Sequence, residues 1–425
     1  MADVTAALPA PRRFTGPPTL EPRIPGNGQL ARDFMALTFQ LETGRSVPVF
    51  TRFEGPVTVA VEGDAPPSLD ADLNDLLDRL RREARIDITR AGPGEMGAIT
   101  ITALPRAQLQ RLVPGAACFV VPRVAGWQDY LANRFGETTD WTTLETRTRA
   151  SVFLPSDVSA QEIRDCLHEE VAQALGPLND LHRLAHSIFN DDNVHVVLTA
   201  FDMAILRATY DPALRSGMTQ EQVAAILPDV LARTNPAGRQ SDPGAVPESS
   251  SDWKAAIAKA VSPGGSDRAR LGQASRAVTL AKQAGWTDER LAFSLLAQGR
   301  AALSEDGDLA LASFLDSAAL YKELGGDGIH SAQVALQLGA FAVSSGRPDA
   351  ALAILDRAIP AADGAQNAAL LSTLLLLRAE ATRMQGATEE ADRIRREGLA
   401  WGRYAWSDRD LARRAAEVAA LSPGA

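Results

Sequence analysis

The stretch His168-Glu-Glu-Val-Ala-Gln-Ala-Leu-Gly-Pro-Leu-Asn-Asp180 decides how the first half of the chain is interpreted. It continues a helix that begins upstream, because Ser159-Ala-Gln-Glu162 offers an N-cap and a capping box. Gly176-Pro177 then ends the helix after Leu175, since glycine favours a helix end and proline cannot continue one. The sequence therefore predicts one helix from Ser159 to Leu175, followed by a polar turn.

Strand and helix patterns alternate upstream of this helix. Residues 56–62 alternate apolar and polar side chains, which predicts a strand, whereas leucines in residues 69–84 recur at helical spacing. The order strand, helix, several strands and helix predicts an α+β domain. Further short runs, rich in β-branched residues and bounded by glycine or proline, predict strands at residues 86–89, 98–102, 118–122 and 151–154.

Two segments poor in apolar periodicity mark domain boundaries. Residues 1–30 hold six prolines and no apolar period, which predicts an extended Pro-rich tether. In residues 235–252, proline, glycine and serine displace apolar residues, which predicts a flexible linker. We therefore expect a first domain over residues 31–234 and a second over residues 253–425.

The second domain is predicted to be all-helical and repetitive. Turn glycines at Gly307, Gly346 and Gly386 are 39 and 40 positions apart, and an alanine follows each of them five positions later. Small residues precede these turns at Gly299, Gly339 and Ala379, where paired helices would approach closely. Such a period is typical of stacked helical hairpins and resembles the tetratricopeptide repeat, although the aromatic residues of that consensus are missing. An irregular helical bundle is the alternative.

Composition excludes several classes of protein. The 425 residues, 45% hydrophobic and 23% charged, indicate a globular chain of two or three domains. The net charge is −10 and no Lys/Arg-rich run occurs, so nucleic acid is not an expected partner. No stretch approaches the roughly 18 apolar residues of a membrane span. Cys118 and Cys166 are too few for a disulfide scaffold or a zinc clip.

The helix of residues 159–175 carries the only chemical signal. Metalloproteases bind zinc through the helical motif H-E-x-x-H, in which the glutamate activates the metal-bound water. A frame that begins at His168 fails, because Ala172 would occupy the second ligand position. The frame Glu169-Glu170-x-x-Gln173-x-x-Gly176-x-x-Asn179 overlays H-E-x-x-H-x-x-G-x-x-H, with every ligand histidine replaced and the general-base glutamate retained.

Downstream residues extend this resemblance to the metzincin peptidases. Ser187-Ile-Phe189 lies where metzincins place their methionine turn, and residues 198–210 look like the closing helix of the matrixin group. The resemblance implies a metzincin-like zincin fold with a mixed sheet and an active-site-type helix. Residues 30–235 also resemble an uncharacterised proteobacterial family of secreted proteins or lipoproteins, domain-of-unknown-function family 2927. The residues that carry this second resemblance are Thr51-Arg-Phe-Glu-Gly-Pro-Val57, the Glu-Glu-x-x-Gln-x-Leu-Gly run, Ser187-Ile-Phe-Asn-Asp191 and Tyr210-Asp-Pro.

Three hypotheses remain for the replaced site. The simplest is a metal-free polar cluster, with no cofactor. The second is a divalent metal held by oxygen donors from Glu169, Gln173, Asn179 and Asp180, which suit Ca²⁺, Mg²⁺ or Mn²⁺ better than zinc. The third is an active hydrolase with Glu170 as general base. A variant of the metal hypothesis is a rearranged zinc site, formed by His168 and two of His182, His186 and His195.

The resemblance also bears on location and role. It implies that Cys118, at the start of a strand, lies near Cys166 on the helix, so that the two can form a disulfide; two separate buried thiols are the alternative. A disulfide favours a periplasmic or secreted protein, or one lipid-anchored in a longer precursor. The expected function is that of a pseudo-peptidase that binds a peptide or protein in its cleft, with the repeats recruiting a second protein. The alternative is a metal-dependent peptidase with an unusual ligand set.

Overall fold

The computed structural model describes residues 8–20, 24–190, 192, 194–239, 246–262, 264–326 and 328–423. The chain divides into two compact units. One holds residues 15–245, and the other holds residues 246–425 together with residues 1–14. Among the described residues, no helix is long and apolar enough to cross a membrane.

The first unit is built on a mixed sheet with five strands in the described residues. These are β1 (Val57–Gly63), β2 (Ile88–Arg90), β3 (Ile99–Leu104), β4 (Phe119–Pro122) and β5 (Ala150–Pro155). Their order is β2-β1-β3-β5-β4, and only the edge strand β4 runs antiparallel to its neighbour. Each predicted strand is confirmed within two residues, because short β-branched runs suit a sheet that is buried on both faces.

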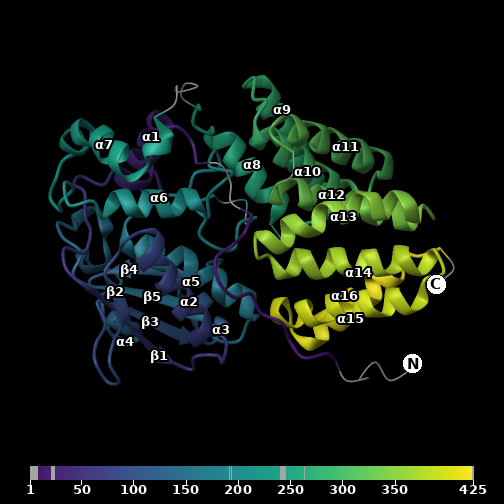
Figure 1. Cartoon of the computed structure of the whole chain (residues 1–425). Helices are drawn as coiled ribbons and strands as arrows, with labels where there is room; N and C mark the ends of the chain where they lie inside the picture. Colours follow the sequence, from purple (N-terminus) through teal and green to yellow (C-terminus); the bar gives the residue numbers. More distant parts are fainter. Residues whose placement is uncertain are drawn as a thin grey trace. The chain divides into compact units, whose positions relative to one another are not determined.

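Helices cover both faces of this sheet (Figure 1). In β5, Val152 and Leu154 pack into the core under α2 (Leu69–Glu83) and α5 (Ala160–Leu175), whereas Phe153 points to the opposite face. The opposite face packs against α3 (Arg106–Leu112) and α4 (Gly126–Asn133). The alternation follows from the two-residue period of a strand. The remaining elements of this unit are α1 (Asn27–Phe39), η1 (Glu137–Thr139), η2 (Trp141–Thr143), α6 (Ala200–Thr209), α7 (Gln220–Thr234) and η3 (Pro236–Gly238).

The predicted helix of residues 159–175 is confirmed as α5. Ser159 caps it as expected, because its hydroxyl accepts a hydrogen bond from the Glu162 main-chain N–H at 3.2 Å. The reciprocal half of the predicted capping box is replaced by another contact: the Glu162 carboxylate pairs with Arg106 of α3. The cap therefore forms, and its glutamate links α5 to the helix that follows β3.

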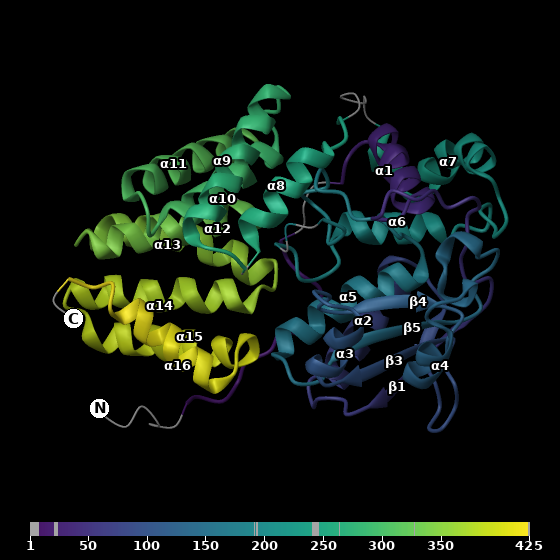
Figure 2. The ribbon, with the colours of Figure 1, turned by 180° about the vertical axis from the view of Figure 1, so that it is seen from behind.

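The second unit is helical throughout its described part, and successive helices pack against one another (Figure 2). A Cβ atom at Gly299 would lie 2.4 Å from the Phe314 ring, and one at Gly339 would lie 2.6 Å from the Leu355 side chain. Close helix approach at these two predicted positions is therefore confirmed. The helices are α8 (Ser251–Val261), α9 (Asp267–Gln283), α10 (Glu289–Ala302), α11 (Gly307–Glu323), α12 (Ile329–Ser344), α13 (Pro348–Gly364), α14 (Ala368–Met384), α15 (Thr388–Ala405) and α16 (Asp408–Ala419).

The predicted tether and linker are corrected at their ends. Helix α1 begins at Asn27, inside the segment 1–30, and residues 9–14 contact α15 of the second unit. Residues 236–238 form η3, and α8 already begins at Ser251, which shortens the predicted linker 235–252. Residues 1–7, 21–23 and 240–245 of these two segments lie outside the described residues.

We expect proteases to cut the chain between η3 and α8. The sequence there is rich in proline, glycine and serine, and it has few apolar side chains that could be buried. Limited proteolysis followed by mass spectrometry should give two protected fragments, and the C-terminal fragment alone should have a helical circular dichroism spectrum. Uniform resistance throughout this segment would contradict two independently folded halves.

Candidate functional site

The carboxyl end of α5 is held by one buried arginine. Arg147 is 3% exposed, and its guanidinium donates to the main-chain oxygens of Gln173, Ala174 and Gly176 at 2.6 to 2.7 Å. The last four carbonyls of a helix have no partner within it, and a cation there also interacts favourably with the helix dipole. Burial lowers the pKa of Arg147 to about 10, so the group stays charged at neutral pH. The Trp141 ring lies beside it, 4.8 Å from the guanidinium carbon.

Residues of two motifs quoted above, residues 51–57 and 210–212, meet at the carboxyl end of α5. The Thr51 hydroxyl accepts a hydrogen bond from Arg147 Nε at 3.1 Å. The Tyr210 hydroxyl donates to the Leu175 main-chain oxygen at 3.2 Å. Arg52 is also buried. Its guanidinium donates to the main-chain oxygens of Thr209, the last residue of α6, and of Asp211, at 3.1 Å each. These motifs therefore hold the end of α5 in place.

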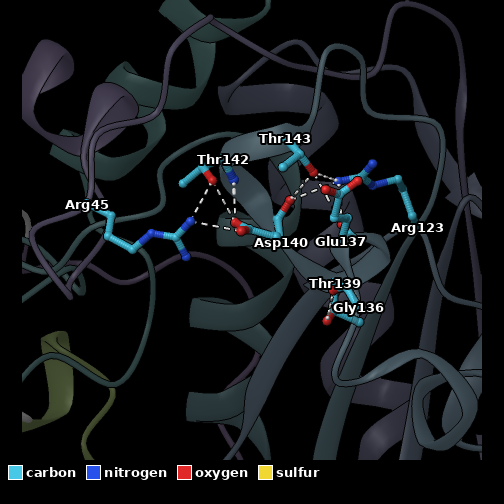
Figure 3. A network of polar contacts seen from close by, with 8 residues as sticks. All are labelled: Arg45, Arg123, Gly136, Glu137, Thr139, Asp140, Thr142 and Thr143. Atoms are coloured by element: carbon cyan, nitrogen blue, oxygen red, sulfur yellow. Dashed lines mark hydrogen bonds and ion pairs between the residues drawn. The ribbon is translucent and has the colours of Figure 1, made fainter.

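Trp141 belongs to a loop whose polar contacts hold it against Arg147. Figure 3 shows this network around Asp140. The Asp140 carboxylate accepts from Arg45 at 2.8 Å and from the Thr142 main-chain N–H at 2.9 Å. These bonds, that from Arg45 first, lower the pKa of Asp140 to about 2, so the carboxylate stays ionised at neutral pH. Arg123 donates to the Asp140 main-chain oxygen at 2.8 Å. The loop is thereby fixed on both sides.

We predict that Arg147→Ala lowers the free energy of unfolding by about 3 kcal/mol or more, because it leaves buried carbonyls without a charged donor. Arg147→Lys should recover part of the loss, since an ammonium has fewer donors and no planar fork. Urea unfolding measures both variants. The control Arg149→Ala, two residues along, should stay within about 0.5 kcal/mol of the wild type. A similarly small effect of Arg147→Ala would contradict its role at this helix end.

Glu170, the predicted general base, lies in the interior. It is 5% exposed, and its Oε2 atom has no hydrogen-bond partner among the described residues. Burial raises its pKa well above the usual range, and the negative charges of Glu169, Glu42 and Asp165 raise it further. Glu170 therefore keeps its proton at pH values where an exposed glutamate is ionised.

We predict that Glu170→Gln stabilises the protein at pH 8 more than at pH 4.5. In the unfolded chain a glutamate loses its proton near pH ~4.3, whereas in the folded chain Glu170 retains it to higher pH. The wild type therefore loses stability as the pH rises from the unfolded pKa to the folded pKa, and glutamine does not titrate. The gain should be about 1.4 kcal/mol for each unit by which the folded pKa exceeds the unfolded one.

Urea unfolding of both proteins at the two pH values measures this difference. Glu145→Gln, at an exposed glutamate, controls for the loss of one negative charge. A difference between Glu170→Gln and the wild type that is the same at both pH values would show that Glu170 is ionised in the folded protein.

The side chains of the predicted oxygen-ligand set make contacts within the first unit. The Gln173 amide nitrogen donates to the Asp180 carboxylate at 3.5 Å. The Asn179 amide nitrogen donates to the Ala36 main-chain oxygen at 3.0 Å, and Glu169 is half-buried on α5. In the described part of the chain, no group of three or more His, Cys, Asp and Glu side chains is arranged to hold a metal ion. The metal set stays a prediction.

His168 serves the packing of α5. It is 1% exposed, and its Nδ1 atom accepts a hydrogen bond from the Leu198 main-chain N–H at 3.1 Å. Burial, followed by the charges of Arg164 and Arg79, lowers the pKa of His168 well below its usual value. The ring is therefore neutral. The hydrogen bond to Nδ1 positions Leu198, which directly precedes Thr199, the N-cap of α6.

The other predicted histidine ligands are used separately. The His186 ring contacts the Phe201 ring edge to face, with the centroids 4.5 Å apart. A His195 ring nitrogen lies 3.1 Å from the Ala185 main-chain oxygen. His182 is buried. The described residues thus contain no cluster of these histidines suited to the rearranged zinc site.

Asp202 joins the segment 187–189 to α6. Its carboxylate accepts hydrogen bonds from the Ser187 hydroxyl at 2.5 Å and from the main-chain N–H groups of Ile188 and Thr199 at 3.2 and 2.7 Å. Burial raises the pKa of Asp202 to about 6, although these bonds oppose the shift. Sequence analysis selected the segment and the closing helix but missed both Asp202 and Arg147. An aspartate three residues after Thr199 is the one local signal that was available.

A disulfide joins Cys118, directly before β4, to Cys166 on α5, with the Cα atoms 5.9 Å apart. The bond ties the edge strand to the helix that carries Glu170. It closes a loop over a sequence separation of 48 residues. The edge of the sheet and the candidate site are thus covalently connected.

Comparison with known proteins finds one matching family model, over less than half of the chain, and no activity. Residues 27–229, which span α1 to most of α7, match the family described as Protein of unknown function (DUF2927). No curated protein and no solved structure matches the chain. The function must therefore be argued from the site itself.

Proposed function

We propose that the protein is an extracytoplasmic binding protein whose metzincin-like first domain holds a peptide or protein segment without hydrolysing it. The observation that carries this proposal is the state of Glu170. A general base must be ionised and must reach the water that it activates. Glu170 is buried, its Oε2 atom has no hydrogen-bond partner among the described residues, and burial raises its pKa well above the usual range, so that ionisation and contact with bulk water are both disfavoured.

The surrounding contacts support the same role. His168 uses its ring nitrogen to fix Leu198, and Asn179 binds the Ala36 carbonyl. Gln173 faces Asp180. A hydrolase would require these contacts to open around a metal, whereas a binding protein can keep them, because the helix then only shapes the floor of the site.

The sheet edge offers a place for an extended peptide. Strand β4 lies at the edge of the sheet, and the disulfide of Cys118 and Cys166 holds it beside α5. An exposed sheet edge binds an extended chain through main-chain hydrogen bonds, and neighbouring side chains then provide specificity. The paired helices of the second unit supply a further surface of the kind that repeat proteins use for partners.

The disulfide supports a periplasmic or secreted location. Disulfides persist in oxidising compartments and are rare in the reducing cytosol. The mass of the protein isolated from its native compartment should show both cysteines oxidised. Two free thiols in the folded chain would remove this argument for an extracytoplasmic location.

The proposal is tested with a reduced, alkylated model protein as a source of extended peptide segments. The wild type and Glu170→Gln should bind it with equal affinity, and intact-mass spectrometry should find it uncut by either protein. Elemental analysis of the purified chain should find less than one metal ion per molecule. Cleavage by the wild type that Glu170→Gln abolishes would establish the hydrolase alternative, and absence of binding to both proteins would refute the binding role.

A further inference from the structure

The N-terminal segment, residues 8–14, lies along α15 of the helical unit (Figures 1 and 2). The Phe14 ring stacks on the Trp401 ring, with centroids 4.3 Å apart and planes 24° apart. Phe14 is 6% exposed and Trp401 is 8% exposed, so both rings are almost fully removed from water. Such a stacked aromatic pair is the type of contact that dominates binding energy at interfaces.

Arg12 makes the second anchor of the segment. Its guanidinium pairs with Glu397 at 2.7 Å and lies 5.7 Å from the centre of the Trp401 ring. Its main-chain N–H donates to the Ala400 oxygen at 3.0 Å. Asp363 of α13 adds a second negative charge: burial and Glu397 raise the pKa of Asp363, and the charge of Arg12 lowers it. The helical unit thus presents an acidic pair beside an aromatic platform.

The main chain before Arg12 is also recognised. Arg403 donates to the Pro9 oxygen at 3.0 Å, while it pairs with Asp408 at 3.1 Å. Pro9 and Pro11 keep this part of the segment extended and leave its carbonyls open to donors. An extended Pro-rich chain loses little conformational entropy on binding, which is why aromatic grooves recognise such segments.

We propose that this surface of α13 and α15 is a binding site for extended peptides in which proline precedes an Arg-x-aromatic motif, and that residues 8–14 occupy it in cis. Trp401 binds the aromatic ring, Glu397 binds the arginine, and Arg403 binds the carbonyl of a proline, while Asp363 adds negative charge nearby. In trans, the site binds an extended segment of another protein that carries the same proline, arginine and aromatic residues. The inference goes beyond the proposed function of the first domain, because it concerns residues of the helical unit alone.

The cis segment then regulates the site by competition. A segment of the same chain competes with every ligand in trans, so such a ligand must displace it. Release of residues 8–14 frees the aromatic platform and the acidic pair together. The site is therefore closed in the isolated chain and opens when a better ligand is present.

The test uses the full chain and a fluorescent peptide that carries residues 8–14, Leu-Pro-Ala-Pro-Arg-Arg-Phe. The double variant Arg12→Ala/Phe14→Ala should bind the peptide at least about tenfold more tightly than the wild type, as measured by fluorescence anisotropy, because its own segment no longer competes. Adding Trp401→Ala to the double variant should abolish binding. Adding Trp406→Ala, a tryptophan directly after the same helix, should leave binding unchanged.

A charge exchange keeps the test informative if Trp401→Ala disturbs folding. In the double variant, Glu397→Lys should weaken binding of the peptide that carries residues 8–14. The same change should restore binding of a second peptide in which glutamate replaces Arg12. Equal affinity of the wild type and the double variant, or no response to the charge exchange, would overturn the site. Binding of the unfolded model protein by the Trp401→Ala variant would show that the proposed function survives such a failure.

Discussion

The guanidinium of Arg147, bonded to three main-chain oxygens at the end of α5, is the contact on which the candidate site depends. The helix ends inside the domain, where unpaired carbonyls are costly, and no local cap supplies several donors at once. Arg147 provides a charge and a fork of donors, and the loop around Asp140 holds Trp141 over it. The direction of α5 follows from this contact.

The part of α5 that carries Glu170 is also fixed at its other end, by the disulfide of Cys166. Cys166 is bonded to Cys118 beside β4, so that the residues between Cys166 and Gln173 lie between a disulfide and the hydrogen bonds of Arg147. Glu170 lies in that interval, turned inward without a hydrogen-bond partner for Oε2 among the residues described. A buried, unpaired carboxyl group costs stability, and groups with such perturbed pKa values cluster at functional sites. The contacts at both ends hold this part of α5 in place although Glu170 is buried in it.

The sequence predicted the elements that local periodicity determines. The strands and α5 were found because alternation and capping are read from neighbouring residues. Arg147 was missed because its partners are 26 to 29 positions away and a single arginine carries no pattern. The contacts of the Pro-rich segment were missed for the same reason: Arg12 and its partner Glu397 are 385 positions apart, and prolines alone indicate only an extended chain. The helix α5 itself was predicted correctly, but the contacts of each side chain on it depend on tertiary structure.

The proposed role of the first domain, binding without hydrolysis, rests on a Glu170 side chain that stays neutral in the folded protein. Infrared difference spectroscopy of the wild type against Glu170→Gln at neutral pH tests it most directly, since a carboxylic acid and a carboxylate absorb at different frequencies. We expect a carboxylic acid band in the wild type that the variant lacks. A carboxylate band in its place would show that Glu170 is ionised in the folded protein and would contradict its proposed neutral state.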